Sequence, residues 1–508
     1  MSGREAATRW RDQRLVVPVV YIAVMFMSVL DTTIVTVALP AVGRDLHAGA
    51  GNLALVSVAY LVALGVFIPV SGWLGDLLGG RRALLAAIAV FTIASLLCGL
   101  ATSLPELVAF RFLQGTGGAV MTPVGLAMLF RVYPPAERVR VAAVVTVFVT
   151  LGPALGPVLG GVFTTYLTWR LAFVVNVPFG LAAFVVGLLF LDAHDQPHPG
   201  RLDVPGLVLS GLGLASLLFG VSVGPDLGWT DPVVLTTVVA GALMLAALVI
   251  VERRAERPLI AVHLFGDGLF RASTALYALG SVAFIGTLFL IALFLQDALG
   301  LSAVQSGLTT FPSALGTMLG AQLVTRQLYW RLGPRRIIIA GLLLIALSAG
   351  LLGQVTATTS LWLVRLIMFA LGAGVAAVFI PSQAASMATI DRTATSRASA
   401  LFNAGKQIGS AVGVALLSTV ATAIGTTHLD HGRSTANLTA YHAGFWAAAA
   451  VAILAVGVAC TVRDADAAQT MTRPGKKSAR PSDPGLPQAS SGTTVRPPAA
   501  GAAVSRGS

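Results

Sequence analysis

The stretch LVVPVVYIAVMFMSVLDTTIVTVALP, residues 15–40, carries a single charged side chain, Asp31. A helix rises about 1.5 Å per residue, so a run of this length can cross the roughly 30 Å hydrocarbon core of a bilayer. The run is too long for the apolar core of a signal peptide. An ionisable group inside such a helix costs roughly 2.5–3.5 kcal/mol, so it normally faces a cavity or a partner. We therefore interpret residues 15–40 as a transmembrane helix whose acid has a role.

Thirteen further apolar runs follow along the chain. The chain is 56% apolar and 11% charged, too little charge to cover the surface of a soluble protein. We predict an all-α integral membrane protein with fourteen transmembrane helices. The remaining predicted spans are 53–73, 83–101, 107–130, 139–163, 171–191, 204–223, 232–251, 272–295, 303–325, 337–354, 361–385, 398–423 and 441–462.

The basic residues follow this topology. Of the 33 Lys and Arg, three fall in predicted outer loops and three inside helices, which leaves 27 for the inner loops and the two termini. The three within helices are Arg111, Arg365 and Lys406. An excess of Lys and Arg on the cytoplasmic side is the usual bias of membrane proteins, so both termini are expected in the cytoplasm. The net charge of +12 thus reflects topology and does not indicate a nucleic-acid partner.

An internal repeat divides the chain. LGGRR (78–82) matches LGPRR (332–336) at an offset of 254 residues, and the same offset relates Arg111 to Arg365. Parallel repeats of this kind are a secondary-transporter architecture. We predict five segments: a cytoplasmic N-terminus (1–14), an N-terminal six-helix bundle (15–191), a linker with two inserted transmembrane helices (192–269), a C-terminal six-helix bundle (270–462) and a disordered cytoplasmic tail (463–508).

Four motifs lie within this framework: LDTTIVTVALP (30–40), GWLGDLLGGRR (72–82), RFLQGTGG (111–118) and GPALGPVLGG (152–161). Together they resemble the major facilitator superfamily, specifically its fourteen-helix drug:proton antiporter branch. Two further stretches, 169–178 and 403–409, look similar to that branch as well. The resemblance implies the major facilitator fold and a monomer in a bacterial plasma membrane. Its partners would be a small-molecule substrate, protons and the lipid bilayer, with the proton gradient in place of any cofactor.

Asp31 and Arg111 are the candidate proton-coupling residues. Counting residues along their helices places both at a similar depth from the outer side, so a pair, direct or through Gln114, is possible. Burial raises the pKa of a carboxyl and a nearby cation lowers it, which suits a switchable proton carrier. A static buried pair that only fixes helix packing is the alternative. The predicted substrate cavity comprises Asp31, Gln114, Asn403, Lys406 and Gln407.

Two regions are candidates for conformational gating. In the fifth predicted helix, glycines at every fourth position allow close helix approach and prolines bend the backbone; the residues are Gly152, Pro153, Gly156, Pro157 and Gly160. In the first inner loop, charge contacts of Asp76 and of the Arg81–Arg82 pair across the cytoplasmic mouth would hold one conformation and release in the other. The gating residues predicted there are Gly72, Asp76, Gly79 and Arg81. The alternatives are a generic kinked packing helix and a solvated turn that carries topology charges.

The resulting hypothesis is export of drugs, antibiotics or related small amphipathic compounds in exchange for protons by alternating access. An uptake symporter, an exporter of a native metabolite and a non-transporting sensor or scaffold are the alternatives. The sequence contains no phosphate-binding loop of the Walker type and no constellation typical of an enzyme, so we predict no catalytic activity. His428, His431 and His442 lack a supporting acid or thiol pattern, and we predict no metal site.

Overall fold

The computed structural model describes residues 12–47, 50–192, 203–252, 261–391, 394–425, 427–430 and 433–471. The predicted tail beyond residue 471 and the N-terminal eleven residues therefore lie outside the described part. The first half of the chain forms six spans: α2 (Gln13–Asp45), α3 (Ala50–Leu78), α4 (Gly80–Leu100), α5 (Leu104–Val132), α6 (Pro135–Tyr166), and the pair α7 (Leu171–Val174) and α8 (Asn176–Phe190).

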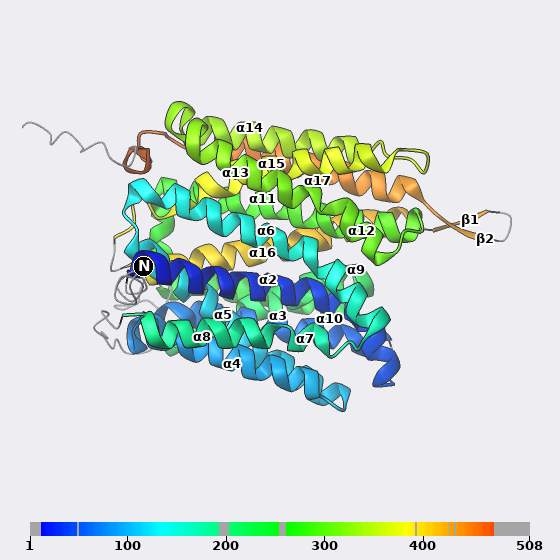
Figure 1. Ribbon diagram of the computed structural model, residues 1–508, viewed down its shortest axis with the longest axis horizontal. Helices are drawn as coiled ribbons and strands as arrows, with labels where there is room; N and C mark the ends of the chain where they lie inside the picture. Colours follow the sequence, from blue (N-terminus) through cyan, green and yellow to red (C-terminus); the bar gives the residue numbers. More distant parts are fainter. Residues whose placement is uncertain are drawn as a thin grey trace, which may run out of the picture. The chain divides into compact units, whose positions relative to one another are not determined.

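Two helices, α9 (Val204–Leu227) and α10 (Pro232–Glu252), connect this half to the next. The second half begins after a short 3-10 turn, η1 (Val262–Gly266). Its elements are α11 (Gly268–Leu293), η2 (Phe294–Ala298), α12 (Ala303–Thr310), α13 (Pro312–Leu323), η3 (Val324–Leu328), α14 (Tyr329–Leu352), α15 (Leu361–Ser386), α16 (Thr395–Ile424) and α17 (Leu438–Ala459), with η5 (Ala468–Thr470) after it. The helices run side by side in Figure 1.

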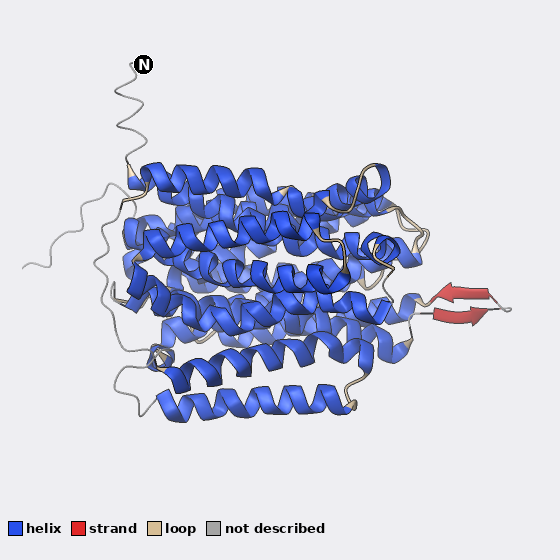
Figure 2. Ribbon diagram, turned by 90° about the horizontal axis from the view of Figure 1, so that it is seen from below, coloured by secondary structure: helices blue, strands red, loops and turns tan. Residues whose placement is uncertain are grey.

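One element departs from the all-helical prediction. Strands β1 (Thr427–Asp430) and β2 (Arg433–Ala436) form an antiparallel hairpin between α16 and α17. The hairpin projects from the ends of the helices, at the right in Figure 2. It lies outside the apolar runs, so it does not alter the predicted spans.

The number of spans depends on how the longest segment is divided. Among the described residues, twelve helical segments are long and apolar enough to cross a membrane. One of them, Val304–Leu352, is 49 residues long and contains two predicted spans that are separated by a backbone break at Gly333. Helix α6 covers the one predicted span outside those twelve segments. The helices of the structure thus contain all fourteen predicted ranges, apart from a few residues at their ends.

The backbone confirms the repeat. Gly79, before α4, has φ 78° and ψ 146°, and Gly333, inside α14, has φ 77° and ψ 164°. This region of φ and ψ is nearly exclusive to glycine, because a Cβ would clash with the backbone. The two LG-x-RR motifs therefore form the same turn in each half, as their shared spacing predicted.

The inserted pair α9 and α10 packs at the edge of the bundle. Helix α9 contacts α10, α3 of the first half and α16 of the second half. Helix α10 contacts mainly α9, and large side chains such as Leu243 are exposed on it. In a bilayer such an apolar surface faces lipid.

Helices α6 and α16 occupy equivalent places where the halves meet. Helix α6 contacts α12, α13 and α15 of the second half, and α16 contacts α3 and α5 of the first half. Each is also packed on the first helix of its own half, α6 on α2 and α16 on α11. The predicted gating helix, α6, is therefore one of the helices that connect the halves.

Candidate functional site

Asp31 lies at the centre of a buried hydrogen-bond network. Arg111 donates from Nη1 to Asp31 Oδ2 over 2.6 Å, and Gln114 donates from Nε2 to Asp31 Oδ1 over 2.8 Å. The exposed fraction is 0% for Asp31 and Gln114 and 2% for Arg111. Arg111 Nη1 also donates to Gln114 Oε1 over 2.8 Å. The structure thus forms both contacts that the sequence left open, the direct pair and the link through Gln114.

Two further residues complete the network. Asn176, the first residue of α8, donates from Nδ2 to Asp31 Oδ1 over 3.0 Å and to Ser95 Oγ over 3.2 Å. Ser95 Oγ in turn accepts from Gln114 Nε2 and donates to the carbonyl of Phe173. Sequence reasoning assigned no role to either residue. Asn176 lies in a motif that resembles the antiporter branch, whereas a lone serine in an apolar helix carries no signal.

The guanidinium of Arg111 also contacts two aromatic rings and a backbone carbonyl. The guanidinium carbon of Arg111 lies 4.4 Å from the ring centre of Tyr60 and 5.7 Å from that of Phe173. Its Nε donates to the carbonyl of Val56 over 3.3 Å. Aromatic faces stabilise a desolvated guanidinium. Six helices, α2, α3, α4, α5, α7 and α8, therefore supply the shell around one ion pair.

The chemistry of the network depends on the charge of Asp31. With the carboxylate ionised, the pair with Arg111 is neutral overall, and three donor groups satisfy its oxygens. Protonation removes the ion pair and turns one oxygen into a donor. Asn176 Oδ1 is buried and accepts no hydrogen bond within the described residues, so an acceptor lies close to the carboxyl. The two protonation states of Asp31 therefore favour different hydrogen-bond arrangements.

Charged residues connect the two halves at the predicted cytoplasmic end. Asp76, near the end of α3, lies 3.7 Å from Arg131 of α5 and 3.8 Å from Arg397 of α16. Arg131 donates from Nη2 to Ser396 Oγ over 2.7 Å. Gly72 is close to the same segment, because an added Cβ would lie 3.3 Å from Arg397 Cα. Asp76 and Gly72 thus contact the opposite half, and their gating role stays a prediction.

Arg81 does not take part in that contact. Its Nη2 donates to the carbonyl of Leu188 in α8, over 2.7 Å, within its own half. The prediction of a charge contact across the mouth by Arg81 is therefore wrong for this structure. The reason is the turn at Gly79, which places Arg81 on the first turn of α4, where it reaches the end of α8.

The glycines of α6 form a close contact with α2. A Cβ added at Gly152 would lie 2.6 Å from Val29 Cγ1, and one added at Gly156 would lie 2.6 Å from Thr33 Cβ. Thr33 Oγ1 also donates to the carbonyl of Gly152 over 3.3 Å. Gly160 packs against the next turn of α2. Pro153 and Pro157 belong to the same helix, but their side chains lie outside the described part.

A second run of glycines makes the same contact in the other half. Gly405, Gly409 and Gly413 of α16 face Thr274, Ala278 and Val282 of α11, and a Cβ at Gly409 would lie 2.8 Å from Ala278 Cα. The spacing is the same as in α6, so it was visible in the sequence, but sequence reasoning singled out the run in α6 alone.

The three remaining predicted cavity residues, Asn403, Lys406 and Gln407, lie together on α16. Asn403 is buried and donates to the carbonyl of Ser399 in its own helix, over 2.9 Å. Lys406 and Gln407 are half-buried. The recorded hydrogen bonds of the Asp31 network include none of the three. The structure thus divides the predicted cavity residues into two groups, one in each half.

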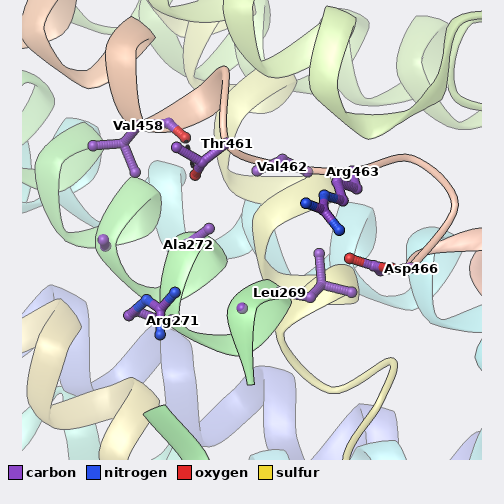
Figure 3. Close-up of a pocket in the computed structure, with 10 residues that line it drawn as sticks. Leu269, Arg271, Ala272, Val458, Thr461, Val462, Arg463 and Asp466 are labelled. Carbon is purple, nitrogen blue, oxygen red and sulfur yellow. Dashed lines mark hydrogen bonds between the residues drawn. The ribbon is translucent and has the colours of Figure 1, made fainter. Parts of the chain in front are cut away.

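A separate cavity of about 640 Å³ opens between the start of α11 and the end of α17. Figure 3 shows Arg271, Arg463 and Asp466 around it, with apolar side chains such as Leu269 and Val458. Arg271 is held by a hydrogen bond to the carbonyl of Phe265. None of the predicted site residues lines this cavity.

Within the described residues, no group of three or more His, Cys, Asp and Glu is arranged to hold a metal ion. The side chains of His428 and His431 lie outside that part. His442 bonds to the carbonyl of Val355. The absence of a metal site thus stays a prediction.

Two repeated helical halves with a buried ion pair in one of them define a membrane transporter. Comparison with known proteins agrees: the family model of the Major Facilitator Superfamily matches residues 21–414 and, in a second match, 276–500. The chain belongs to the major facilitator superfamily.

Relatives within that family carry export names. The cephamycin export protein CmcT of Amycolatopsis lactamdurans is 35% identical over 88% of this chain and 91% of its own length. The tetracenomycin C resistance and export protein of Streptomyces glaucescens is 32% identical over 77% of this chain and 73% of its own. The human organic anion transporter MFSD10 has a similar fold, with a TM-score of 0.62, 17% identity, and coverage of 88% of this chain and 99% of that one.

Proposed function

We propose that this protein exports drugs, antibiotics or related small amphipathic compounds in exchange for protons, by alternating access. The observation that carries the proposal is the carboxyl group of Asp31, buried in the membrane-spanning part of the first half with Arg111, Gln114 and Asn176 as partners. Export names among the relatives support the direction of transport. We further propose a bacterial plasma membrane with both termini in the cytoplasm.

Protonation of Asp31 is the coupling step of this proposal. A proton that enters from outside binds the carboxylate, and the cluster changes from neutral to a net charge of +1. The ion pair with Arg111 is lost, so the packing among α2, α5 and α8 is free to change. Asp76 contacts both α5 and α16 at the other end, and release of those contacts would open the cytoplasmic mouth. Loss of the proton to the cytoplasm restores the pair.

Energetically, one proton is a sufficient driving force. A charge that moves down 100 mV releases about 2.3 kcal/mol, which corresponds to more than tenfold accumulation of a neutral substrate. A non-transporting scaffold would gain nothing from a charge in this position, because a buried pair is often no more stable than apolar residues of similar volume. Export of a native metabolite would use the same proton-coupling residues. The two functions differ only in the substrate that is transported.

The test uses inverted membrane vesicles and a fluorescent drug, with and without an imposed pH gradient. Asp31→Asn keeps the size and most hydrogen bonds of the side chain but cannot take up a proton. We expect gradient-driven transport to vanish while binding of a neutral drug, measured in detergent, remains. Asp45→Asn is the matched control, since Asp45 is an acid of the same helix that pairs with Arg170 near its end, with 47% of its side chain exposed. Gradient-driven transport by Asp31→Asn at the wild-type rate would refute the proposal.

A further inference from the structure

Lys406 is a cation inside the membrane-spanning part of α16. It lies eleven residues after Thr395, the first residue of the helix, or about 17 Å along the axis. The ammonium lies deep among the helices, yet the side chain is half-buried and keeps some accessible surface. Helix α16, which carries it, also contacts α3 and α5 of the other half.

No carboxylate of the described residues neutralises it. Within that part of the chain, no ion pair or hydrogen bond of its ammonium is recorded. Among the helices that contact α16, the acids of α3 and α5 are at helix ends: Asp76 faces Arg131 and Arg397, and Glu106 accepts from Thr102. Asp297 lies in η2, beyond the end of α11. An ion inside a membrane protein normally has a partner, so the missing partner points to a ligand.

The buried pair of the other half cannot serve as that partner. Asp31 already accepts from Arg111, Gln114 and Asn176, and its charge is cancelled by Arg111. It lies eighteen residues after Gln13, the first residue of α2, or about 27 Å along that axis, which is deeper than Lys406 from the same end. With Asp31 ionised and paired, the charge of Lys406 is therefore not cancelled by the buried pair of the other half.

The neighbours of Lys406 on the helix are polar. Asn403 and Ser410 lie three and four residues away and share its face, and Gln407 follows it directly in the chain. The adjacent face, with Gly405, Gly409 and Gly413, is packed on α11 and is not available to a ligand. The ammonium has only donors, which suits an anionic group of a ligand. The amide and hydroxyl groups beside it can donate or accept hydrogen bonds to the rest of a small molecule.

We infer that the substrates of this transporter carry an acidic group, such as a carboxylate, and that Lys406 binds it. The inference rests on the proposed export function and narrows it from amphipathic compounds in general to organic anions. The binding of such an anion neutralises the charge of Lys406. Asp31 would thus bind the proton, and Lys406 would bind the substrate.

A matched pair of probes tests the inference. One is a fluorescent dye with a single free carboxylate, and the other is its methyl ester. We expect inverted vesicles with the wild-type protein to transport the acid with a kcat/KM at least tenfold above that of the ester. Lys406→Met, which keeps the length of the side chain, should lower kcat/KM for the acid at least tenfold and change that for the ester less than twofold. Lys406→Arg should retain most transport of the acid.

The outcomes distinguish the two proposals. Equal loss of acid and ester transport in Lys406→Met would show a structural role and overturn the inference, as would wild-type preference for the ester. Both results leave the export proposal intact. Wild-type vesicles that transport neither probe nor any other drug would refute export instead. In that case the affinity for the acid is measured in detergent, where no gradient is needed. Equal affinity of the wild-type protein and Lys406→Met would overturn the proposed role of Lys406.

Discussion

The two halves of the molecule share their packing and differ in their charges. In each half the fifth span lies on the first through three glycines at four-residue spacing, Gly152 to Gly160 on α2 and Gly405 to Gly413 on α11. The position that corresponds to Asp31 by the repeat is Ile285, which packs against the apolar core. A duplicated fold has thus kept the contacts that form its helix bundles, while the buried acid is confined to one copy.

Arg111 and Arg365, which correspond to each other by the repeat, also differ in their surroundings. Arg111 is buried and bonded to Asp31, whereas Arg365 is half-buried, with its guanidinium 4.6 Å from the ring centre of Trp362. Trp362 is itself 75% exposed. Identical residues at equivalent positions therefore have different surroundings, because among the described residues only Arg111 has a carboxylate within reach.

The largest expected difference is between Arg111→Ala and Arg365→Ala. Loss of Arg111 leaves an uncompensated carboxylate in the membrane-spanning part, which costs about 3–5 kcal/mol of folding stability. Arg365→Ala removes a stacking contact at a partly exposed site, worth about 0.5–1 kcal/mol. Thermal unfolding in detergent should show a large drop for the first variant and a small one for the second, and transport should fall only in the first.

A double variant separates charge from folding. Asp31→Asn in the Arg111→Ala background removes the uncompensated charge, so the unfolding midpoint should recover while proton-coupled transport stays absent. Equal destabilisation by Arg111→Ala and Arg365→Ala would contradict the proposed asymmetry of the halves.

A smaller effect is expected at the glycine contacts. Gly409→Ala places a methyl group against the backbone of Ala278, which cannot move, whereas Gly156→Ala meets the side chain of Thr33. Overpacking of a rigid site costs about 1–3 kcal/mol, so Gly409→Ala should lower the unfolding midpoint more than Gly156→Ala does. Gly457→Ala, with no atom within 4 Å of the added Cβ, is the control. A greater effect of Gly156→Ala would indicate a special role of the contact in the first half.

The smallest expected effect concerns the repeated turn. Gly79→Ala and Gly333→Ala each force a Cβ into a backbone conformation that only glycine adopts readily, at a cost of about 1 kcal/mol. At Gly333 the added Cβ would also lie 2.7 Å from the carboxyl carbon of Asp464. Differential scanning fluorimetry should show a modest drop for both variants, larger for Gly333→Ala. An unchanged midpoint in either would show that the turn relaxes without strain.

Most of the fold could be predicted from sequence, because apolar runs of membrane length leave few alternatives to helices in a bilayer. The hairpin 427–436 was missed, since it lies between spans where length carries no signal. At the candidate site, Asp31 and Arg111 could be found because charge inside an apolar run is conspicuous, and Gln114 because it lies one helical turn after Arg111. Ser95 could not, because small polar side chains occur in membrane helices for many reasons. Asn176 lies in a motif that the sequence analysis quoted, but only its proximity to Asp31 reveals its role.

The sequence by itself determined the membrane-spanning helices, the duplicated halves, and the presence of an acid and three cations within the spans. These properties depend on the order of residues along the chain, where hydropathy and spacing are read directly. Only the tertiary structure decided which charges meet: Arg111 reaches Asp31, Arg81 bonds within its own half, and Lys406 has no counter-ion among the described residues. The physical reason is that electrostatic pairing depends on distances of a few ångströms between helices that are far apart in sequence.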